Sequence, residues 1–425
     1  MRDFNTLLAK IKTKKAKVGI IGLGYVGLPL AVAFAKKGFQ VTGFVRGKKK
    51  VEDLQNGLNY LKDESIDKDL KNVINKKQLT ATLVDDNTLE KQDIIIICVP
   101  TPVTENKEPD MEPFKAVAER LSTIDLSGKL VINESTVSPF MTRNIIGSLP
   151  GDYFLVCSPE RVDPGNKKWK TTNIPKLVGG VDKESLDLAV TLYKLVLQDG
   201  VVPVKNLEIT EMSKMLENTY RAVNIALINE FAKLADSCNI DILDVIEAAK
   251  TKWSFHAHYP GIGVGGHCIP VDPYYITAFA KDRGISMNLT AMGLRENEEM
   301  PEYVLNKLLA HYKKGMSVLV YGITYKKNVN DLRESPVVHF CSLLKKNEIP
   351  FIVYDPLIPR EEIEKLGFIS GYLKKVDILI VGTDHPTLEK DSNRIITKDT
   401  IIIDGRNYFL TKKGKMVLGV GRTLK

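Results

Sequence analysis

A glycine-rich turn between an apolar run and an apolar helical segment constrains this chain more than any other feature. The run Lys17–Gly22 predicts a buried strand, and Leu28–Lys37 predicts a helix. Between them stands Gly22-Leu-Gly24-Tyr-Val-Gly27, and a second strand is expected at Gln40–Phe44. A strand, a glycine turn, a helix and a strand within about 30 residues form the setting in which this spacing binds a dinucleotide.

Each glycine of the turn has a physical task. Gly22 permits the tight turn, Gly24 allows close approach to a pyrophosphate, and Gly27 lets the helix pack on the strand. The helix N-terminus then offers N–H groups and a positive dipole end to the phosphates. We therefore expect a cofactor site that comprises Gly22, Gly24, Tyr25, Val26 and Gly27.

The end of the second expected strand lacks the acid that an NAD site usually places there. That Asp or Glu accepts hydrogen bonds from the ribose hydroxyls. Here the chain reads Val45-Arg46-Gly-Lys-Lys-Lys50, and Val45 has no acceptor. Arg46 and Lys50 favour a 2′-phosphate, and the alternative is a solvated basic loop.

The length and the alternation of patterns predict an α/β protein of several domains. A chain of 425 residues fits two or three domains. Strand patterns separated by helical ones fill the first 200 residues and resume after residue 316. We expect two Rossmann-like doubly wound parallel-sheet domains, 1–200 and 301–425, joined by a helical middle domain, 201–300. Its long helix, 207–236, contains no Gly or Pro and has one apolar face. That face comprises Met215, Thr219, Ala222, Ala226 and Phe231.

Composition excludes several classes of function. The net charge of +8 comes without a dense basic block, which is weak support for nucleic-acid binding. Five scattered cysteines without a CxxC pair favour a reducing cytoplasm and no structural metal site. The N-terminus has no apolar core of a secretory signal, and no apolar run is long enough to span a bilayer. We expect a cytoplasmic protein that binds neither membrane nor nucleic acid.

Three further motifs carry residue types suited to catalysis. Cys268 follows a glycine-dense loop, which gives a thiolate access, and Asp272 lies four residues on. Lys214 and Asn218 are four apart on a predicted helix, where both can stabilise an oxyanion. Glu160, in Ser158-Pro-Glu-Arg161, follows a strand end and is a candidate general base. The alternatives are an inert loop cysteine and an exposed polar stripe.

Basic residues cluster after strand ends in the last third of the chain. Lys326 and Arg333 follow its first expected strand, and Arg406 follows a later one. These cations are candidates for binding phosphates.

Together these motifs resemble the UDP-glucose/GDP-mannose dehydrogenase family. The resemblance runs from about Ala16 to the C-terminus and rests on GGHC, EMSKxxEN, SPER and DLRESP in the right order. It implies a homodimer and an NAD-dependent oxidation of the C6 alcohol of a UDP-sugar to a carboxylate, by two hydride transfers. NADP stays open because Val45 replaces the family's Asp.

The resemblance also implies roles for single residues. Cys268 traps the aldehyde as a thiohemiacetal that becomes a thioester, Lys214 and Asn218 stabilise the alkoxide, and Glu160 is the hydrolytic base. Asp272 and Thr136 organise the water, whereas Thr101 and Ser135 lie on the cofactor side. The residues expected to bind substrate are Arg161, Lys252, Gly265, Lys326, Arg333 and Arg406.

Finer detail predicts the substrate. Val271 and the stretch Glu160-Arg-Val-Asp-Pro-Gly-Asn resemble the matching residues of enzymes that oxidise UDP-N-acetylglucosamine. The alternatives are a UDP-N-acetylmannosamine dehydrogenase and a binding protein without turnover. An epimerase-type enzyme would need a Tyr-x-x-x-Lys pair in the first domain and no thiol.

Overall fold

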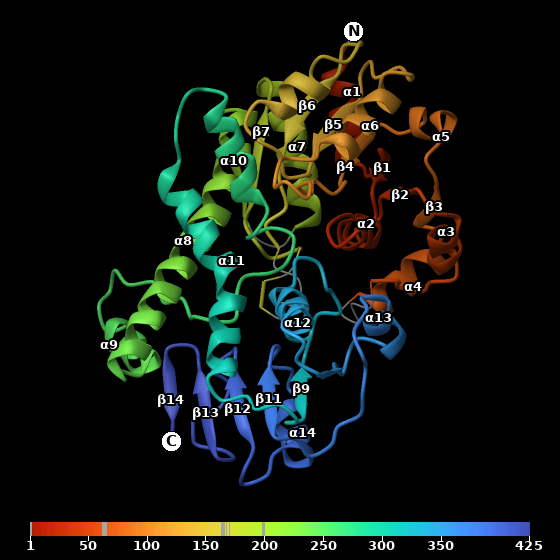
Figure 1. The fold of residues 1–425 in the computed structure, drawn as a ribbon. Helices are drawn as coiled ribbons and strands as arrows, with labels where there is room; N and C mark the ends of the chain where they lie inside the picture. Colours follow the sequence, from red (N-terminus) through yellow and green to blue (C-terminus); the bar gives the residue numbers. More distant parts are fainter. Residues whose placement is uncertain (1, 62–65, 163–165, 167, 170, 198–199) are drawn as a thin grey trace. The chain divides into compact units, whose positions relative to one another are not determined.

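The computed structural model describes residues 2–61, 66–162, 166, 168–169, 171–197 and 200–425. These form two compact units (Figure 1). The first unit comprises Met1–Glu217 with Tyr274–Phe279, and the second comprises Asn218–Pro273 with Ala280–Lys425.

The first unit is built on a sheet that contains eight strands among its described residues, in the order β3-β2-β1-β4-β5-β6-β7-β8. Neighbouring strands are parallel except for β6 and β7, which are antiparallel. The strands on one side of the switch point are β1 (Lys17–Ile21), β2 (Gln40–Val45) and β3 (Leu79–Leu83). On the other side lie β4 (Ile94–Ile97), β5 (Leu130–Asn133), β6 (Phe154–Cys157), β7 (Lys176–Gly180) and β8 (Val201–Val204).

Helices cover this sheet because its central strands are apolar on both faces. All four residues of β4, β5 and β6 are buried, as expected for parallel strands between helices. Alternate residues of β1, β4, β5 and β6 form one core cluster with α1, α2 and α7. The helical segments of this unit are α1 (Phe4–Lys12), α2 (Gly27–Lys36), α3 (Lys48–Gln55), α4 (Asp67–Asn75), α5 (Asp86–Glu90), α6 (Glu112–Leu121), the π-helical η1 (Thr142–Ile146) and α7 (Lys183–Val196).

The predicted long helix is α8 (Leu207–Cys238), which begins in the first unit and ends in the second. Met215, Thr219, Ala222 and Ala226 are buried as one face. The prediction that Phe231 shares this face is wrong, because Phe231 is half exposed. Phe231 comes eleven residues after the exposed Tyr220. Eleven residues advance an α-helix by about three full turns, so Phe231 lies on the same exposed side of α8 as Tyr220. Three more helices follow: α9 (Ile242–Ala249), α10 (Asp272–Lys281) and α11 (Asn288–Leu309).

The second unit contains the other sheet, in the order β10-β9-β11-β12-β13-β14. Its pairs are parallel except β13–β14. The strands are β9 (Val318–Tyr321), β10 (Ile352–Tyr354), β11 (Ile378–Val381), β12 (Ile401–Asp404), β13 (Met416–Gly419) and β14 (Arg422–Leu424). The helices between them are α12 (Pro336–Lys346), α13 (Arg360–Lys365) and α14 (Leu388–Ile395). The predicted fold class, two Rossmann-like sheets with a helical segment between them, is confirmed. In the described part of the chain, every helix is too short or too polar to cross a bilayer.

Candidate active site

The glycine turn of the first unit has the shape that a pyrophosphate requires. Gly22 has φ +93°, and a Cβ there would overlap the carbonyl group of Cys98. Gly27 begins α2, and a Cβ there would overlap the carbonyl oxygen of Gly22. At Gly24, which is exposed, a Cβ would meet no atom within 4 Å. The backbone at Gly24 is therefore accessible, and the turn with half-buried Tyr25 and Val26 fits a dinucleotide.

The end of β2 carries positive charge and no carboxylate. Val45 is buried at the last position of the strand, and Arg46 is exposed. Lysines 48–50 then form the first turn of α3, where the helix dipole is also positive. The Nζ of Lys50 lies 5.2 Å from the centroid of the Tyr60 ring, and the Tyr60 hydroxyl donates to the Leu23 carbonyl. Lys50 is thus held against an aromatic ring.

Three more of the predicted residues lie just beyond the carboxyl ends of β4 and β5. Thr101 is half-buried in the segment after β4, and Thr136 is half-buried after β5. Ser135 is buried, and its Oγ accepts the Val99 N–H at 2.9 Å. The Ser135 side chain therefore ties the two strand ends together.

Glu160 lies at the same edge, beyond β6, and is almost fully buried. Its Oε1 accepts the backbone N–H groups of Arg161 at 2.7 Å and Val162 at 2.9 Å. Burial alone would raise the pKa of Glu160, but the Lys176 ammonium, these N–H groups and Lys214 together hold it below its ordinary value. Glu160 is therefore a carboxylate at neutral pH.

Two buried charges beside Glu160 were missed by the sequence reasoning. Lys176 Nζ lies 2.5 Å from an oxygen of Glu134 and 3.5 Å from Oε2 of Glu160. The Tyr193 hydroxyl donates to the other oxygen of Glu134. Burial raises the pKa of Glu134 to about 7 against the opposing effect of Lys176. The available signal was Lys176 at the start of the stretch Pro175–Gly179, which has a strand pattern, because a lysine is rarely buried unless it is paired.

Arg161 and Lys214 complete the set predicted in the first unit. The Arg161 guanidinium pairs with Glu217 at 2.8 Å and donates to the Pro175 carbonyl. Lys214 is buried on α8, one turn before Asn218. Near the start of the same helix, Glu211 accepts the N–H groups of Phe140 at 2.7 Å and Thr142 at 2.9 Å.

In the second unit, Asp272 links the backbone of Cys268 to the side chain of Asn218. Asn218 Nδ2 donates to Asp272 Oδ2 at 2.5 Å, and the Asp272 N–H donates to the Cys268 carbonyl at 2.8 Å. Cys268 is half-buried, whereas Cys98, Cys157 and Cys341 are fully buried. Burial raises the pKa of those three thiols. Cys268 is thus more accessible than they are, and its carbonyl is bonded to the backbone of Asp272, whose carboxylate accepts from Asn218.

The loop before Cys268 is held against the second sheet. The Ile262 N–H donates to the Gly405 carbonyl at 2.8 Å, and the Gly266 N–H donates to the Arg333 carbonyl at 3.2 Å. A Cβ on Gly265 would lie 2.6 Å from Tyr325 Cβ and 2.7 Å from the Glu334 carbonyl oxygen. Only glycine fits there without a shift of backbone.

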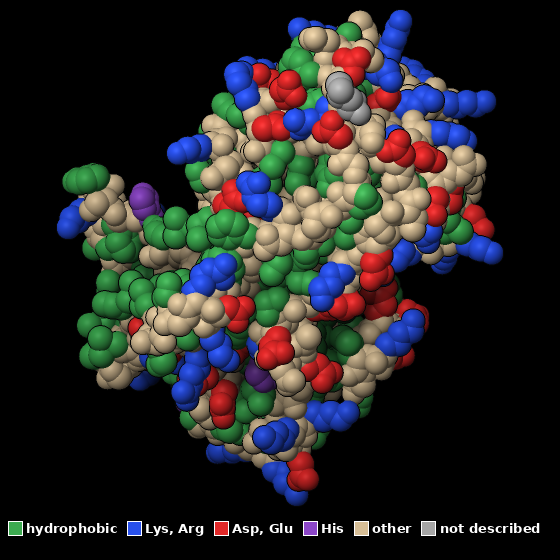
Figure 2. Space-filling model, turned by 90° about the horizontal axis from the view of Figure 1, so that it is seen from above, with side chains coloured by type: hydrophobic (Ala, Val, Ile, Leu, Met, Phe, Trp, Pro, Cys, Tyr) green, Lys and Arg blue, Asp and Glu red, His purple; other side chains and the backbone are tan. Residues whose placement is uncertain are grey.

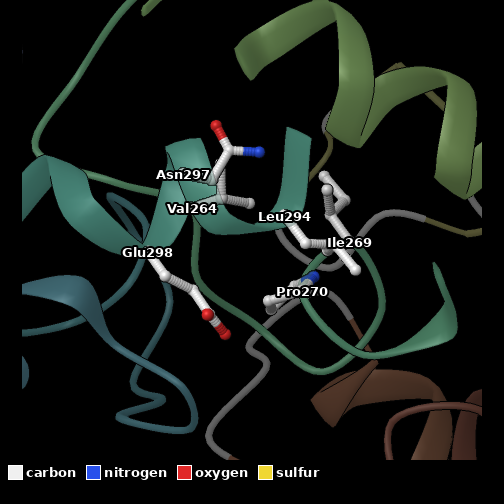
Figure 3. A pocket seen from close by; sticks show the side chains of 6 residues that line it. All are labelled: Val264, Ile269, Pro270, Leu294, Asn297 and Glu298. Atoms are coloured by element: carbon white, nitrogen blue, oxygen red, sulfur yellow. The ribbon is translucent and has the colours of Figure 1, made fainter. Parts of the chain in front are cut away.

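The predicted basic residues of the second unit surround this loop. Arg406 donates to the carbonyls of Gly382 and Tyr325, each at 2.8 Å, and Lys326 is half-buried after β9. Arg333 pairs with Asp331 at 2.6 Å. A small hollow adjoins the same loop, and its lining comes from the loop and α11 (Figure 3): Val264, Ile269, Pro270, Leu294, Asn297 and Glu298. Lys252 is exposed in the segment after α9.

The second unit lacks an available acid where a dinucleotide fold would offer one. Asp355 directly follows β10, and the comparable position in the first unit is the end of β2, where Val45 is the last residue. Its carboxylate accepts the N–H of Ile323 at 2.7 Å and of Leu357 at 2.8 Å, and it lies 3.2 Å from His385 Nε2. The acid is therefore occupied by the chain itself.

Glu160, Lys214, Thr136, Thr101 and Ser135 thus belong to the first unit. Cys268, Asn218, Asp272, Gly265 and the basic residues lie in the second. Of the motif Glu160-Arg-Val-Asp-Pro-Gly-Asn, residues 163–165 lie outside the described residues.

Three consecutive segments match the domain models of one family, the UDP-glucose/GDP-mannose dehydrogenase family. Residues 16–197 match its NAD binding domain, 208–299 its central domain and 319–411 its UDP binding domain.

Curated relatives and solved structures match nearly the whole chain. The UDP-N-acetyl-D-glucosamine 6-dehydrogenase of Salmonella typhi is 36% identical over 93% of this chain and 97% of its own. The UDP-N-acetyl-D-mannosamine dehydrogenase of Pyrococcus horikoshii is 33% identical over 96% of this chain and 99% of its own. A solved structure of a UDP-glucose dehydrogenase from Pyrobaculum islandicum has a TM-score of 0.86 at 25% identity, covering 96% of this chain and 98% of its own.

Proposed function

Because the chain belongs to the UDP-glucose/GDP-mannose dehydrogenase family, we propose that it oxidises the C6 hydroxyl of UDP-N-acetylglucosamine to the carboxylate. The chain is an NAD-dependent UDP-sugar dehydrogenase, and its relatives support a UDP-N-acetylhexosamine as substrate. The observation that carries the proposal is the half-buried Cys268, next to the Asn218–Asp272 contact on a loop that tolerates only glycine at position 265.

The first half of the reaction forms an aldehyde that the enzyme must retain. Lys214 donates to the alkoxide that develops at C6, and Asn218 donates beside it. The thiolate of Cys268 then adds to the aldehyde carbon and gives a thiohemiacetal. Its oxidation yields a thioester bonded to Cys268. An exposed thiol would exchange with solvent species, and a fully buried one would not reach the carbon.

The second half hydrolyses that thioester. Glu160 takes a proton from the attacking water while the thiolate of Cys268 leaves. Asp272 and Thr136 orient the water in this assignment. Glu160 suits the role of base because its two carboxyl oxygens differ. Oε1 is fixed by two backbone N–H groups, whereas Oε2 accepts no hydrogen bond within the chain and can take the proton.

The turn from Gly22 to Gly27, with Thr101 and Ser135 beyond it, would hold the cofactor. NAD, when bound, supplies the acceptor for the hydride in both oxidations. The chain's departure at β2 bears on which dinucleotide it prefers. Val45 gives the ribose hydroxyls no acceptor, and Arg46 with Lys50 and the first turn of α3 favours a 2′-phosphate. We propose that NADP is used at least comparably to NAD.

The nucleotide end of the substrate belongs to basic residues in this proposal. Lys326, Arg333 and Arg406 take the UDP moiety, because guanidinium and ammonium groups suit diphosphates. Gly265 lets the loop approach the sugar closely, and Arg161 contacts the substrate from its position after β6.

We propose a homodimer formed through the exposed stripe of α8 and the neighbouring surface of α11. Tyr220, Leu227, Phe231 and Leu234 form that stripe, and each is about half exposed. Leu289 and Met292 of α11 are exposed as well, at 74% and 62%. Figure 2 shows hydrophobic side chains gathered at the left, the side on which α8 and α9 lie in Figure 1. A second copy suits it because a twofold axis pairs a helix with itself. Lys252 would then contact substrate across the dimer.

A kinetic screen decides the substrate. The purified chain is offered UDP-N-acetylglucosamine, UDP-N-acetylmannosamine and UDP-glucose, with NAD or NADP, and reduced cofactor is counted per sugar. We expect fastest turnover of the gluco N-acetyl sugar with two reduced cofactors per sugar. Preference for the manno epimer, for which the Pyrococcus relative is named, would select the alternative substrate. Absence of turnover with every sugar would mean a binding protein.

A further inference from the structure

Strand β7 brings a lysine to the edge of the first sheet where ligands bind. β7 is antiparallel to β6, with Val156 opposite Gly180 and Cys157 opposite Gly179. Its first residue, Lys176, therefore lies beyond the last residue of β6, beside Glu160. A parallel strand would have placed its first residue at the opposite edge. Lys176 is 3% exposed, so its charge is removed from water.

The buried lysine is held by three contacts. Its ammonium lies 2.5 Å from Glu134 Oε2 and 3.5 Å from Glu160 Oε2, and it lies 5.4 Å from the centroid of the Tyr193 ring. The Tyr193 hydroxyl donates to the second oxygen of Glu134, which fixes that carboxyl. Burial would lower the pKa of Lys176, but the two carboxyls raise it. The lysine is therefore charged, and Glu134 and Tyr193 fix its position.

Stability alone does not explain this cluster. Burying an ammonium and two carboxyls costs desolvation energy that their attraction returns only in part, and apolar residues of similar size are often as stable. The cluster also leaves Oε2 of Glu160 without a hydrogen bond, although Glu160 is only 7% exposed. Oε2 lies 3.5 Å from the Lys176 ammonium, too far for a strong hydrogen bond, so its lone pairs stay available to accept from a bound water.

We propose that Lys176 is a positioning residue that keeps Glu160 ionised and aims its Oε2 at the hydrolytic water, and that Glu134 and Tyr193 hold Lys176 in place. This inference rests on the proposed function, in which Glu160 is the base for thioester hydrolysis. Water gives one proton to Oε2 and its hydroxide to the thioester carbon, and the carbon–sulfur bond breaks. Lys176 keeps its proton throughout, so it contributes charge and not proton transfer.

Charged and titratable groups face Glu160 from each element packed on it. Lys176 comes from β7, Glu134 from the end of β5, Lys214 from α8 and the buried thiol of Cys98 from the end of β4. Tyr193 of α7 reaches the same group through Glu134. Burial raises the pKa of Glu134, so as pH falls its carboxylate competes less with Glu160 for the charge of Lys176. Without that ammonium, burial would dominate and raise the pKa of Glu160 toward the working range.

The test measures how the hydrolysis rate depends on pH in Lys176→Met. Purified enzyme with UDP-N-acetylhexosamine and cofactor is quenched, and the thioester on Cys268 is followed by intact mass between about pH 5.5 and pH 9. We expect the parent to show no acid limb from Glu160 in this range. In Lys176→Met the pH below which hydrolysis slows should be higher by about 1–3 units and so lie within the measured range. The thioester should then accumulate at the most acidic pH values. The KM for the UDP-sugar should stay within about twofold.

Matched variants separate charge from packing. Glu134→Gln keeps the shape of the side chain but removes the carboxylate that competes with Glu160 for the charge of Lys176, so the acid limb should not rise above that of the parent. Lys176→Arg should restore the parent profile at least in part, because it restores the charge. Lys129→Met removes another partly buried lysine of this unit, which donates to the carbonyls of Glu90 and Gln92, and should change nothing.

The outcomes distinguish this inference from the proposed function. If Glu160→Gln hydrolyses the thioester at the parent rate, Glu160 is not the base and the proposed mechanism falls. If Glu160→Gln stalls but Lys176→Met keeps the parent profile, the mechanism stands and the role of Lys176 is wrong. Should Lys176→Met fail to fold, the double variant Lys176→Met/Glu134→Gln leaves no unpaired carboxylate at position 134, and the same shift is expected of it.

Discussion

At the scale of single residues, Cys268 differs from the other cysteines in accessibility and neighbours. Cys268→Ala removes the atom that retains the aldehyde, so acid formation should fall at least about a thousandfold. Binding of the UDP-sugar, measured by calorimetry, should change by less than about threefold, because no phosphate contact is lost. Cys238→Ala, at an exposed cysteine of α8, is the control and should retain full activity. Near-normal acid formation by Cys268→Ala would refute covalent catalysis.

Val45 stands where the resemblance to the family leads us to expect an Asp. Val45→Asp restores a charged acceptor for the ribose, and such a hydrogen bond contributes about 1.5–3 kcal/mol, or about 10- to 150-fold in affinity. We expect NAD to bind more tightly by that factor and NADP more weakly, because the new carboxylate repels a 2′-phosphate. Steady-state kinetics with both cofactors measure this. Arg46→Ala is the companion variant and should weaken NADP alone.

The opposite result is equally informative at this site. If the parent already binds NAD tightly and Val45→Asp brings no gain, the pyrophosphate contacts at the glycine turn suffice. The basic first turn of α3 would then be a solvated surface.

The glycine turn and the contacts of Lys176 show which features of single residues can be predicted from the sequence. The glycine turn was predictable because its three glycines and flanking strand and helix are contiguous in sequence. The contacts of Lys176 with Glu134 and Glu160 were not, because they join three segments through the direction of β7. A charged residue in a strand pattern signals an unusual environment without naming its partner.

At the scale of elements, the start of α8 is tied to the segment before η1 by one carboxyl. Burial raises the pKa of Glu211 to about 7, against the N–H groups that it accepts. The folded state therefore binds a proton that the unfolded state releases above its ordinary pKa. As pH rises from about 5 to 7 the free energy of unfolding should fall, by up to about 3 kcal/mol from this group.

Glu211→Gln should remove that part of the pH dependence, since Gln does not titrate. Urea unfolding at about pH 5 and pH 8 measures the difference. Glu208, on the same turn, is a control of opposite sign. Burial would raise the pKa of Glu208, but the hydrogen bond from Arg143 lowers it, so Glu208 stabilises the fold above its ordinary pKa and that stability is lost as pH falls. Equal pH slopes in the parent and Glu211→Gln would contradict the assignment.

Element type was predictable from the sequence more often than element direction. The strand patterns expected in the first 200 residues and after residue 316 include the mostly apolar stretches 93–99 and 400–404, and strands β4 and β12 lie within them. The exposed stripe on α8 was only partly predictable: the predicted apolar face includes Phe231, which lies on the exposed stripe instead. A large apolar side chain can be buried in the core of its own chain or at an interface with another chain. The sequence of one chain does not show which of the two applies.

At the scale of the whole molecule, the exposed stripe predicts association. Phe231→Glu with Leu227→Glu places two charges on it, and burying them at an interface would be costly. Sedimentation should give twice the 47.4 kDa chain mass for the parent and the chain mass for the variant. Leu410→Glu, at a leucine that is 71% exposed after β12, is the control and should leave the parent's mass unchanged. A monomeric parent would refute the dimer.

The contacts that Asp355 makes within the chain bear on how many dinucleotides one chain binds. The chain repeats one architecture twice, and a repeated architecture raises the question whether a dinucleotide also has two places to bind. In the second sheet the carboxyl after β10 is already satisfied by the backbone after β9 and by His385. The turn after β9 also has Gly322 alone, where the first unit has Gly22, Gly24 and Gly27, so a titration should saturate at one dinucleotide per chain.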